Sequence, residues 1–167
     1  GSLVAIDEAT LATIGTLAIT GDDVDGIIET PAGLLLWGDG SAITATGSAF
    51  VPPATVDAVQ DAVYDATRSQ ILVSTATDAA LPANAIVALD PTDLSVLWSV
   101  PVGFNPNRLS LSDDDAKLYV GVDGSASVAR VDLASQTVDL AFTLGGGSFG
   151  PRYAEDIAAI PGDPDLV

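Results

Sequence analysis

The residues from 108 to 145 alternate between apolar and polar side chains, turn, and alternate again. This period of two predicts β-strands with one face toward a core, because successive side chains of a strand point to opposite faces of the sheet. The intervening turns are rich in Ser, Asp and Gly, which accept tight bends at little cost. The stretch therefore predicts a run of short antiparallel strands.

One pair of strands from this stretch recurs along the chain. Each copy is a short β-branched strand, a turn and a second apolar strand, and the copies span residues 3–17, 86–100 and 128–142. Their first strands end in Asp7, Asp90 and Asp132, which are 83 and 42 residues apart, so one further copy belongs near residue 48, where the Asp is missing. We expect these aspartates to accept backbone hydrogen bonds in the turns.

A second kind of hairpin lies between these copies. Its turns are rich in Pro, Gly, Asp or Ser, and the copies span residues 25–39, 61–75, 107–121 and 155–167. Each unit of about 42 residues then holds four short strands in up-and-down order, which is typical of a β-propeller blade. A β-sandwich has similar strand spacing, but it would not repeat one pair of hairpins four times. We therefore predict an all-β fold of the propeller class.

The order of the hairpins predicts how the chain is divided. The expected parts are a half-blade 1–20, blades at about 21–56, 57–103 and 104–148, and a half-blade 149–167. These four blade-equivalents are circularly shifted, and we expect them to form part of a larger propeller. The helical spacing of Val56, Val59 and Val63 leaves a short helical turn open near 54–60, although the repeat favours a strand there.

Two blades carry a more specific resemblance. The segments "DAVYDATRSQILVS" and "NRLSLSDDDAKLYVGVDGSASVARVDLASQT" resemble the blade repeats of bacterial YVTN/lactonase-type propellers. The segment "ALDPTDLSVLW" resembles the docking motif of quinoprotein-type propellers: Ala88, Asp90 and Trp98 keep its spacing, while Asp93 and Leu94 replace the expected Thr-Gly pair. The resemblance implies a propeller, and it carries no active site with it. Trp98 lies on a predicted fourth strand of its blade, and we expect it to pack between blades.

The net charge and the residue types that the sequence lacks exclude several classes of function. The formal net charge of −18 disfavours binding to nucleic acid or to an anionic lipid surface. The chain has no His or Cys, so the usual general base and the usual zinc ligands are missing. The single lysine, Lys117, is expected to be a solvated cation in a turn. No apolar run approaches the roughly 20 residues of a membrane helix, so we expect no membrane insertion.

These features predict a non-catalytic scaffold or interaction module of a secreted or cell-surface bacterial protein. The alternative is part of a lactonase-like or quinoprotein-like hydrolase or oxidoreductase whose active site lies in other blades. No catalytic residue is predicted.

One carboxylate cluster is a candidate metal site. Asp22, Asp23 and Asp25 precede Gly26, and calcium prefers oxygen ligands from flexible Asp-Gly loops. An exposed turn between blades is the alternative interpretation. No cofactor other than calcium is expected.

The glycine-rich segment 145–153 is the candidate binding loop. It brings Phe149, Arg152 and Tyr153 close together in sequence, and Arg and aromatic residues are enriched where partners bind. A protein or a carbohydrate is the expected partner. An interblade linker with a packed tyrosine is the alternative.

The terminal segments 2–7 and 163–167 are both apolar and are expected to be strands. Unpaired strand edges offer donors and acceptors to another chain. We therefore predict a homodimer that forms an eight-bladed ring through these strands, with a closed four-bladed monomer as the alternative.

Overall fold

The computed structural model describes residues 2–6, 10, 13–18, 26–30, 33–38, 41–45, 55–57, 59–75, 77 and 81–167. Apart from one short 3-10 turn, η1 (Asp123–Ser125), the regular structure of these residues consists of β-strands. An N-terminal hairpin is formed by β1 (Ser2–Ile6) and β2 (Thr13–Ala18).

Three four-stranded antiparallel sheets follow, and we call them the first, second and third blades. The first blade consists of β3 (Gly26–Thr30), β4 (Gly33–Gly38), β5 (Ser41–Ala45) and β6 (Thr55–Asp57). The second consists of β7 (Val59–Asp65), β8 (Gln70–Thr75), β9 (Ala85–Leu89) and β10 (Val96–Pro101). The third consists of β11 (Pro106–Leu111), β12 (Lys117–Val122), β13 (Ser127–Asp132) and β14 (Thr137–Thr143).

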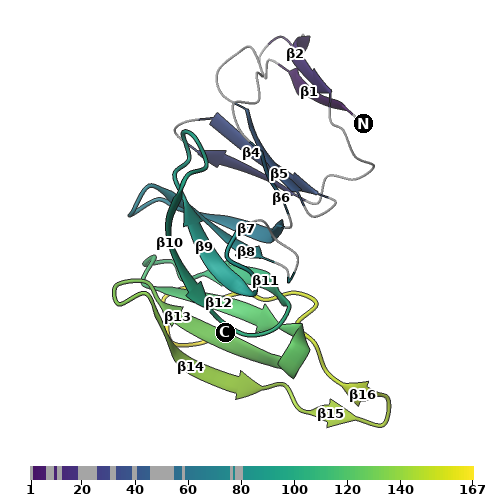
Figure 1. Cartoon of the computed structure of the whole chain (residues 1–167), viewed down its shortest axis with the longest axis vertical. Helices are drawn as coiled ribbons and strands as arrows, with labels where there is room; N and C mark the ends of the chain where they lie inside the picture. Colours follow the sequence, from purple (N-terminus) through teal and green to yellow (C-terminus); the bar gives the residue numbers. More distant parts are fainter. Residues whose placement is uncertain are drawn as a thin grey trace.

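The blades follow one another along the molecule, each with its strands in sequence order (Figure 1). Strand β7 contacts β3 and β4 of the first blade, and β11 contacts β7 and β8 of the second. First strands of successive blades are thus neighbours, as they are around the axis of a propeller. This arrangement confirms the predicted all-β, partial propeller.

The middle strands of the second blade are buried on both faces. All six residues of β8 and all five of β9 are buried, whereas every residue of β14, the outermost strand of the third blade, is exposed. Between the two blades, Leu72 and Ile86 pack with Leu118 and Val120 in one apolar cluster. Trp98 packs against the same cluster, so its predicted place between blades is confirmed.

Side-chain hydrogen bonds connect β7 and β8 of the second blade to β11, the first strand of the third blade. The Asp61 carboxylate accepts from the backbone N–H groups of Leu109 (2.9 Å) and Ala62 (2.8 Å), and Ser74 Oγ donates to the Asn107 carbonyl (2.7 Å). These bonds set the register of one blade against the next.

The pair of strands predicted over residues 155–167 is not formed. Instead the segment lies against the third blade: Ala159 N–H donates to Ser110 Oγ, and the Tyr119 hydroxyl donates to the Pro164 carbonyl. Pro161 and Pro164 have no N–H group to donate to a strand partner, which disfavours a second strand over this part of the segment. Without that second strand, the first strand of the predicted hairpin has nothing to pair with. The strand pairing predicted for the homodimer therefore lacks its C-terminal strand.

Other local predictions have mixed outcomes. Residues 55–57 and 59–65 are strands, so the repeat predicted this region better than the helical spacing did. Asp90 and Asp132 accept backbone N–H groups of their turns, as expected, while Asp7 lies outside the described residues. The expectation for Lys117 was wrong, because its ammonium group is bound between the carboxylates of Asp132 (2.7 Å) and Asp139 (2.8 Å).

Candidate functional site

In an up-and-down blade, the loop after the second strand and the loop to the next blade lie at the same end. In the third blade and its neighbours these are residues 102–105, 123–126 and 144–155. We call this end the loop face, and the opposite end, with the turns inside each hairpin, the turn face. The loop face of a propeller is a place where partners reach backbone and side chains that the sheets hold in position.

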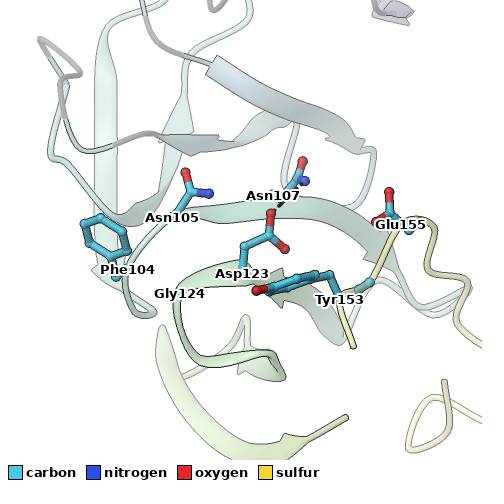
Figure 2. Close-up of a pocket in the computed structure, with 8 residues that line it drawn as sticks. Phe104, Asn105, Asn107, Asp123, Gly124, Tyr153 and Glu155 are labelled. Carbon is cyan, nitrogen blue, oxygen red and sulfur yellow. Dashed lines mark hydrogen bonds between the residues drawn. The ribbon is translucent and has the colours of Figure 1, made fainter. Parts of the chain in front are cut away.

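A cavity of about 320 Å³ opens on the loop face (Figure 2). Its walls come from three separate segments of the chain. The lining residues that carry polar or aromatic groups are Phe104, Asn105, Asn107, Asp123, Tyr153 and Glu155.

Backbone hydrogen bonds hold two of these segments together. The N–H groups of Asp123 and Gly124 donate to the carbonyls of Asn105 (3.1 Å) and Phe104 (3.0 Å). Asn105 has a φ of 55°, a left-handed conformation that Asn tolerates better than most residues, and its own N–H donates to Asn84 Oδ1. The loop before β11 and the η1 turn are therefore fixed relative to each other.

The central polar group of the cavity is the carboxylate of Asp123. Its Oδ2 accepts one hydrogen bond from Asn107 Nδ2 at 3.3 Å, which is the dashed line in Figure 2. Its Oδ1 is shielded from solvent and has no hydrogen-bond partner among the described residues. A buried acceptor without a protein partner is uncommon, and an ordered water molecule or an ion is a usual way to satisfy it.

Three further polar groups around the cavity are unused. Within the described part of the chain, no hydrogen bond engages the side-chain amide of Asn105, the hydroxyl of Tyr153 or the carboxylate of Glu155. Two aromatic rings flank these groups, and they are 62% (Phe104) and 47% (Tyr153) exposed. The cavity thus combines free donors and acceptors with accessible rings.

The charge of the cavity is negative. Asp123 and Glu155 both line it, and no Lys or Arg is among its lining residues. Arg108 approaches its edge, where Nε donates to the Glu155 backbone carbonyl at 3.2 Å. Nearby on β7, burial raises the pKa of Asp61, against the lowering effect of its bonds to Leu109 and Ala62 and of the charge of Arg108.

The structure separates the three residues predicted for binding. Tyr153 lines the cavity, but Phe149 and Arg152 belong to a small hairpin of β15 (Gly146–Gly147) and β16 (Gly150–Pro151). Phe149 is fully exposed near the tip of this hairpin. The three residues thus line two different cavities, and their role in binding a partner stays a prediction.

The predicted calcium ligands Asp22, Asp23 and Asp25 lie outside the described residues, so this site also stays a prediction. Among the residues that the structure does describe, no group of three or more acidic, His or Cys side chains is placed to hold a metal ion.

Sequence reasoning missed Asn105, Asn107, Asp123 and Glu155. The available signal was the repeat itself, which places the run around Asn105 and the Asp123-Gly124 pair in two loops at the same end of one blade. That the side chains leave acceptors unpaired could not be read from the order of residues.

Comparison with known proteins shows the fold. No family model matches the chain, and no curated protein matches its sequence. Among solved structures, the chain is similar to hydrazine synthase of Kuenenia stuttgartiensis, with a TM-score of 0.65 and 19% identity over 84% of this chain and 42% of that chain. It is also similar to BamB from Moraxella catarrhalis, with a TM-score of 0.67 and 14% identity over 87% of this chain and 48% of that chain.

Both of these are β-propeller proteins, so the chain has a propeller-like fold. It spans less than half the length of either. No helix in the described part of the chain has the length and apolar character needed to cross a membrane.

Proposed function

We propose that this chain is a non-catalytic β-propeller module of a secreted or cell-surface bacterial protein, and that its loop face binds a partner. The observation that carries the proposal is the cavity around Asp123, which is lined by unpaired polar groups and by two accessible aromatic residues. A concave site with a few convergent polar groups is the usual form of a recognition site. The lack of His and Cys in the sequence supports binding over catalysis.

The resemblance of two blades to YVTN/lactonase-type repeats supports the bacterial, extracytoplasmic part of the proposal. The high density of acidic residues also suits a protein exposed to a salty or extracellular medium. A protein partner is favoured over a carbohydrate because the cavity carries two carboxylates, which a neutral sugar does not neutralise.

The test is a selection from a random peptide library on the immobilised chain, with an oligosaccharide array in parallel. Each binder is then measured against Glu155→Trp, which fills the cavity from an exposed position, and against Asp93→Asn at the turn face. We expect peptides whose affinity falls by roughly tenfold or more in Glu155→Trp and is unchanged in Asp93→Asn, as for a central residue of an interface. A selection without enrichment, or binders indifferent to Glu155→Trp, would overturn the proposal.

A further inference from the structure

We infer that the cavity on the loop face binds a positively charged side chain, the ammonium group of a lysine or the guanidinium group of an arginine from a protein partner. This inference rests on the proposed function and names the chemistry of the partner. It goes beyond the predicted binding residues, because it is centred on Asp123, Glu155 and Phe104.

The hydrogen-bonding capacity of Asp123 supports a donor ligand. An ionised carboxylate offers roughly four acceptor positions. Asn107 occupies one of them, on Oδ2, at the long distance of 3.3 Å, and the described residues supply no other partner. Because Oδ1 is shielded from solvent, we expect the ligand to bond to Oδ2. Ammonium and guanidinium groups carry donors only, and their bonds to carboxylates are about twice as strong as those between neutral groups.

A second carboxylate gives the cavity a preference for a positively charged ligand, in addition to its preference for a hydrogen-bond donor. Glu155 lies across the cavity from Asn105 in Figure 2, and its carboxylate is unpaired in the described part of the chain. Arg108 donates to the Glu155 carbonyl and not to its carboxylate, so that negative charge stays available. The charge of −18 on the whole chain also raises the local concentration of cations around the site.

The two exposed rings suit the rest of such a side chain. The faces of Phe and Tyr rings attract a cation within about 6 Å of the ring centre. The methylene groups of Lys and Arg also cover apolar surface while their charged ends remain bonded. Phe104 and Tyr153 come from different segments, and in Figure 2 the Asp123 carboxylate lies beside the Tyr153 ring, with Phe104 farther off at the left of the view. The cavity volume of about 320 Å³ is within the range that holds small ligands.

The experiment is a titration of the full chain followed by NMR, with the side-chain amide signals of Asn105 and Asn107 as reporters. The probes are N-acetyl-lysine methylamide and N-acetyl-arginine methylamide, with N-acetyl-norleucine methylamide as the neutral match and methyl glucoside as the sugar. We expect a cationic probe to shift both amide signals with a dissociation constant on the order of 1 mM. The neutral probe and the sugar should bind at least about tenfold more weakly, because they cannot form charge-assisted bonds.

Asp123→Asn keeps the shape and the bond from Asn107 but removes the charge, and it should weaken the cationic probe about tenfold. Asp93→Asn makes the same change in net charge at the turn face and should leave binding unchanged. If Asp123→Asn does not fold, Glu155→Gln takes its place, because this side chain is exposed and unbonded and should also weaken binding.

Equal shifts with the neutral probe, a response to the sugar alone, or no shift with any probe would overturn the inference. Selected peptides that need the loop face but contain no basic residue would leave the proposed function standing and remove only the cationic ligand. Binding of the cationic probes without any selected peptide would leave the cationic site standing and remove the proposed function.

Discussion

A carboxylate at the turn face and one at the loop face, both near the contact between the second and third blades, differ in how completely they are hydrogen-bonded. At the turn face, the Asp65 carboxylate is fully buried and accepts from Arg68 N–H (2.9 Å), Arg68 Nη1 (3.0 Å) and Gln70 Nε2 (2.9 Å). Gln70 Oε1 accepts from Trp98 Nε1, and Arg68 Nη1 also donates to the Asp115 carbonyl of the third blade at 2.7 Å. At the loop face, the Asp123 carboxylate has one long hydrogen bond.

The difference shows which of the two carboxylates serves the fold. A complete network holds a unique arrangement, and removal of one member leaves the others unpaired in a medium of low dielectric. An incomplete network costs free energy and adds little order, so its retention at the loop face fits a site whose missing partner is a ligand.

The largest effect is expected from Asp65→Ala. It leaves the Arg68 guanidinium and the Gln70 amide without their buried acceptor, and loss of one partner of a buried ion pair typically costs about 3 kcal/mol. We expect the free energy of unfolding in urea to fall by about that amount. Asp93→Asn is the control, since Asn can still accept the bond from Ser95 N–H. An unchanged urea midpoint for Asp65→Ala would contradict the importance of the network.

Gly124→Ala should distort the loop face through a steric clash. An added Cβ would lie 2.5 Å from the Phe104 carbonyl oxygen and 2.6 Å from its ring, so the loop before β11 must move. Forced shifts of this kind cost about 2 kcal/mol. The expected result is lower stability together with displaced amide signals for Asn105 and Asn107, while the signals of the Asp65 network stay in place. A spectrum altered equally at both faces would show that the two ends are not independent.

The strands were predictable because their signals are local. The β-branched runs, the turn residues and the two turn aspartates Asp90 and Asp132 each act within a few residues. The predicted alternation was less accurate for the middle strands. In β12, Leu118 faces the second blade while its neighbour Tyr119 is buried on the other side by Ala154 and Val128, so both faces are apolar.

The errors come from contacts that are distant in sequence. Lys117 is opposite Asp132 in the register of β12 and β13, and Asp139 reaches it from β14, so a residue read as a solvated cation is bound by two carboxylates. Asp123 belongs to a site only because Asn107 and Tyr153 approach it from other segments. Periodicity alone does not report which polar groups meet across strands, nor which remain unpaired.

Asp123→Asn should change stability in the direction opposite to Asp65→Asn. The amide at 123 keeps an acceptor for Asn107 and removes a partly buried charge that has only one weak bond. We expect the free energy of unfolding to rise by about 1 kcal/mol, because a charged group left without partners costs more than a neutral one. Asp65→Asn should lower it, since three donors then share one acceptor oxygen. Urea denaturation of the two variants side by side measures the contrast, and a loss of stability in both would contradict it.

The smallest expected effect is on the stability of the folded protein in acid. At the turn face, the hydrogen bond from Arg130 and then that from Lys117 lower the pKa of Asp139, and the bond from Lys117 lowers the pKa of Asp132 below its usual 3.8. A carboxylate with a lowered pKa stabilises the folded protein above its unfolded value, and this contribution is lost as the pH falls through the folded pKa. Asp61 contributes to the pH dependence of stability with the opposite sign. Burial raises its pKa, so its protonation in acid removes the free-energy cost of the buried charge.

Asp139→Asn should therefore reduce the loss of stability below about pH 4, where this carboxyl in the unfolded wild-type chain begins to take up a proton. At pH 7 it should cost less than about 1 kcal/mol, as partly exposed ion pairs do. The measurement is a series of thermal melts between neutral pH and strong acid, at low and at high salt. Salt screens exposed charge pairs, so the difference between wild type and variant should shrink in high salt. A difference that grows in acid would mean that Asp139 stabilises the fold through something other than its pairs with Arg130 and Lys117.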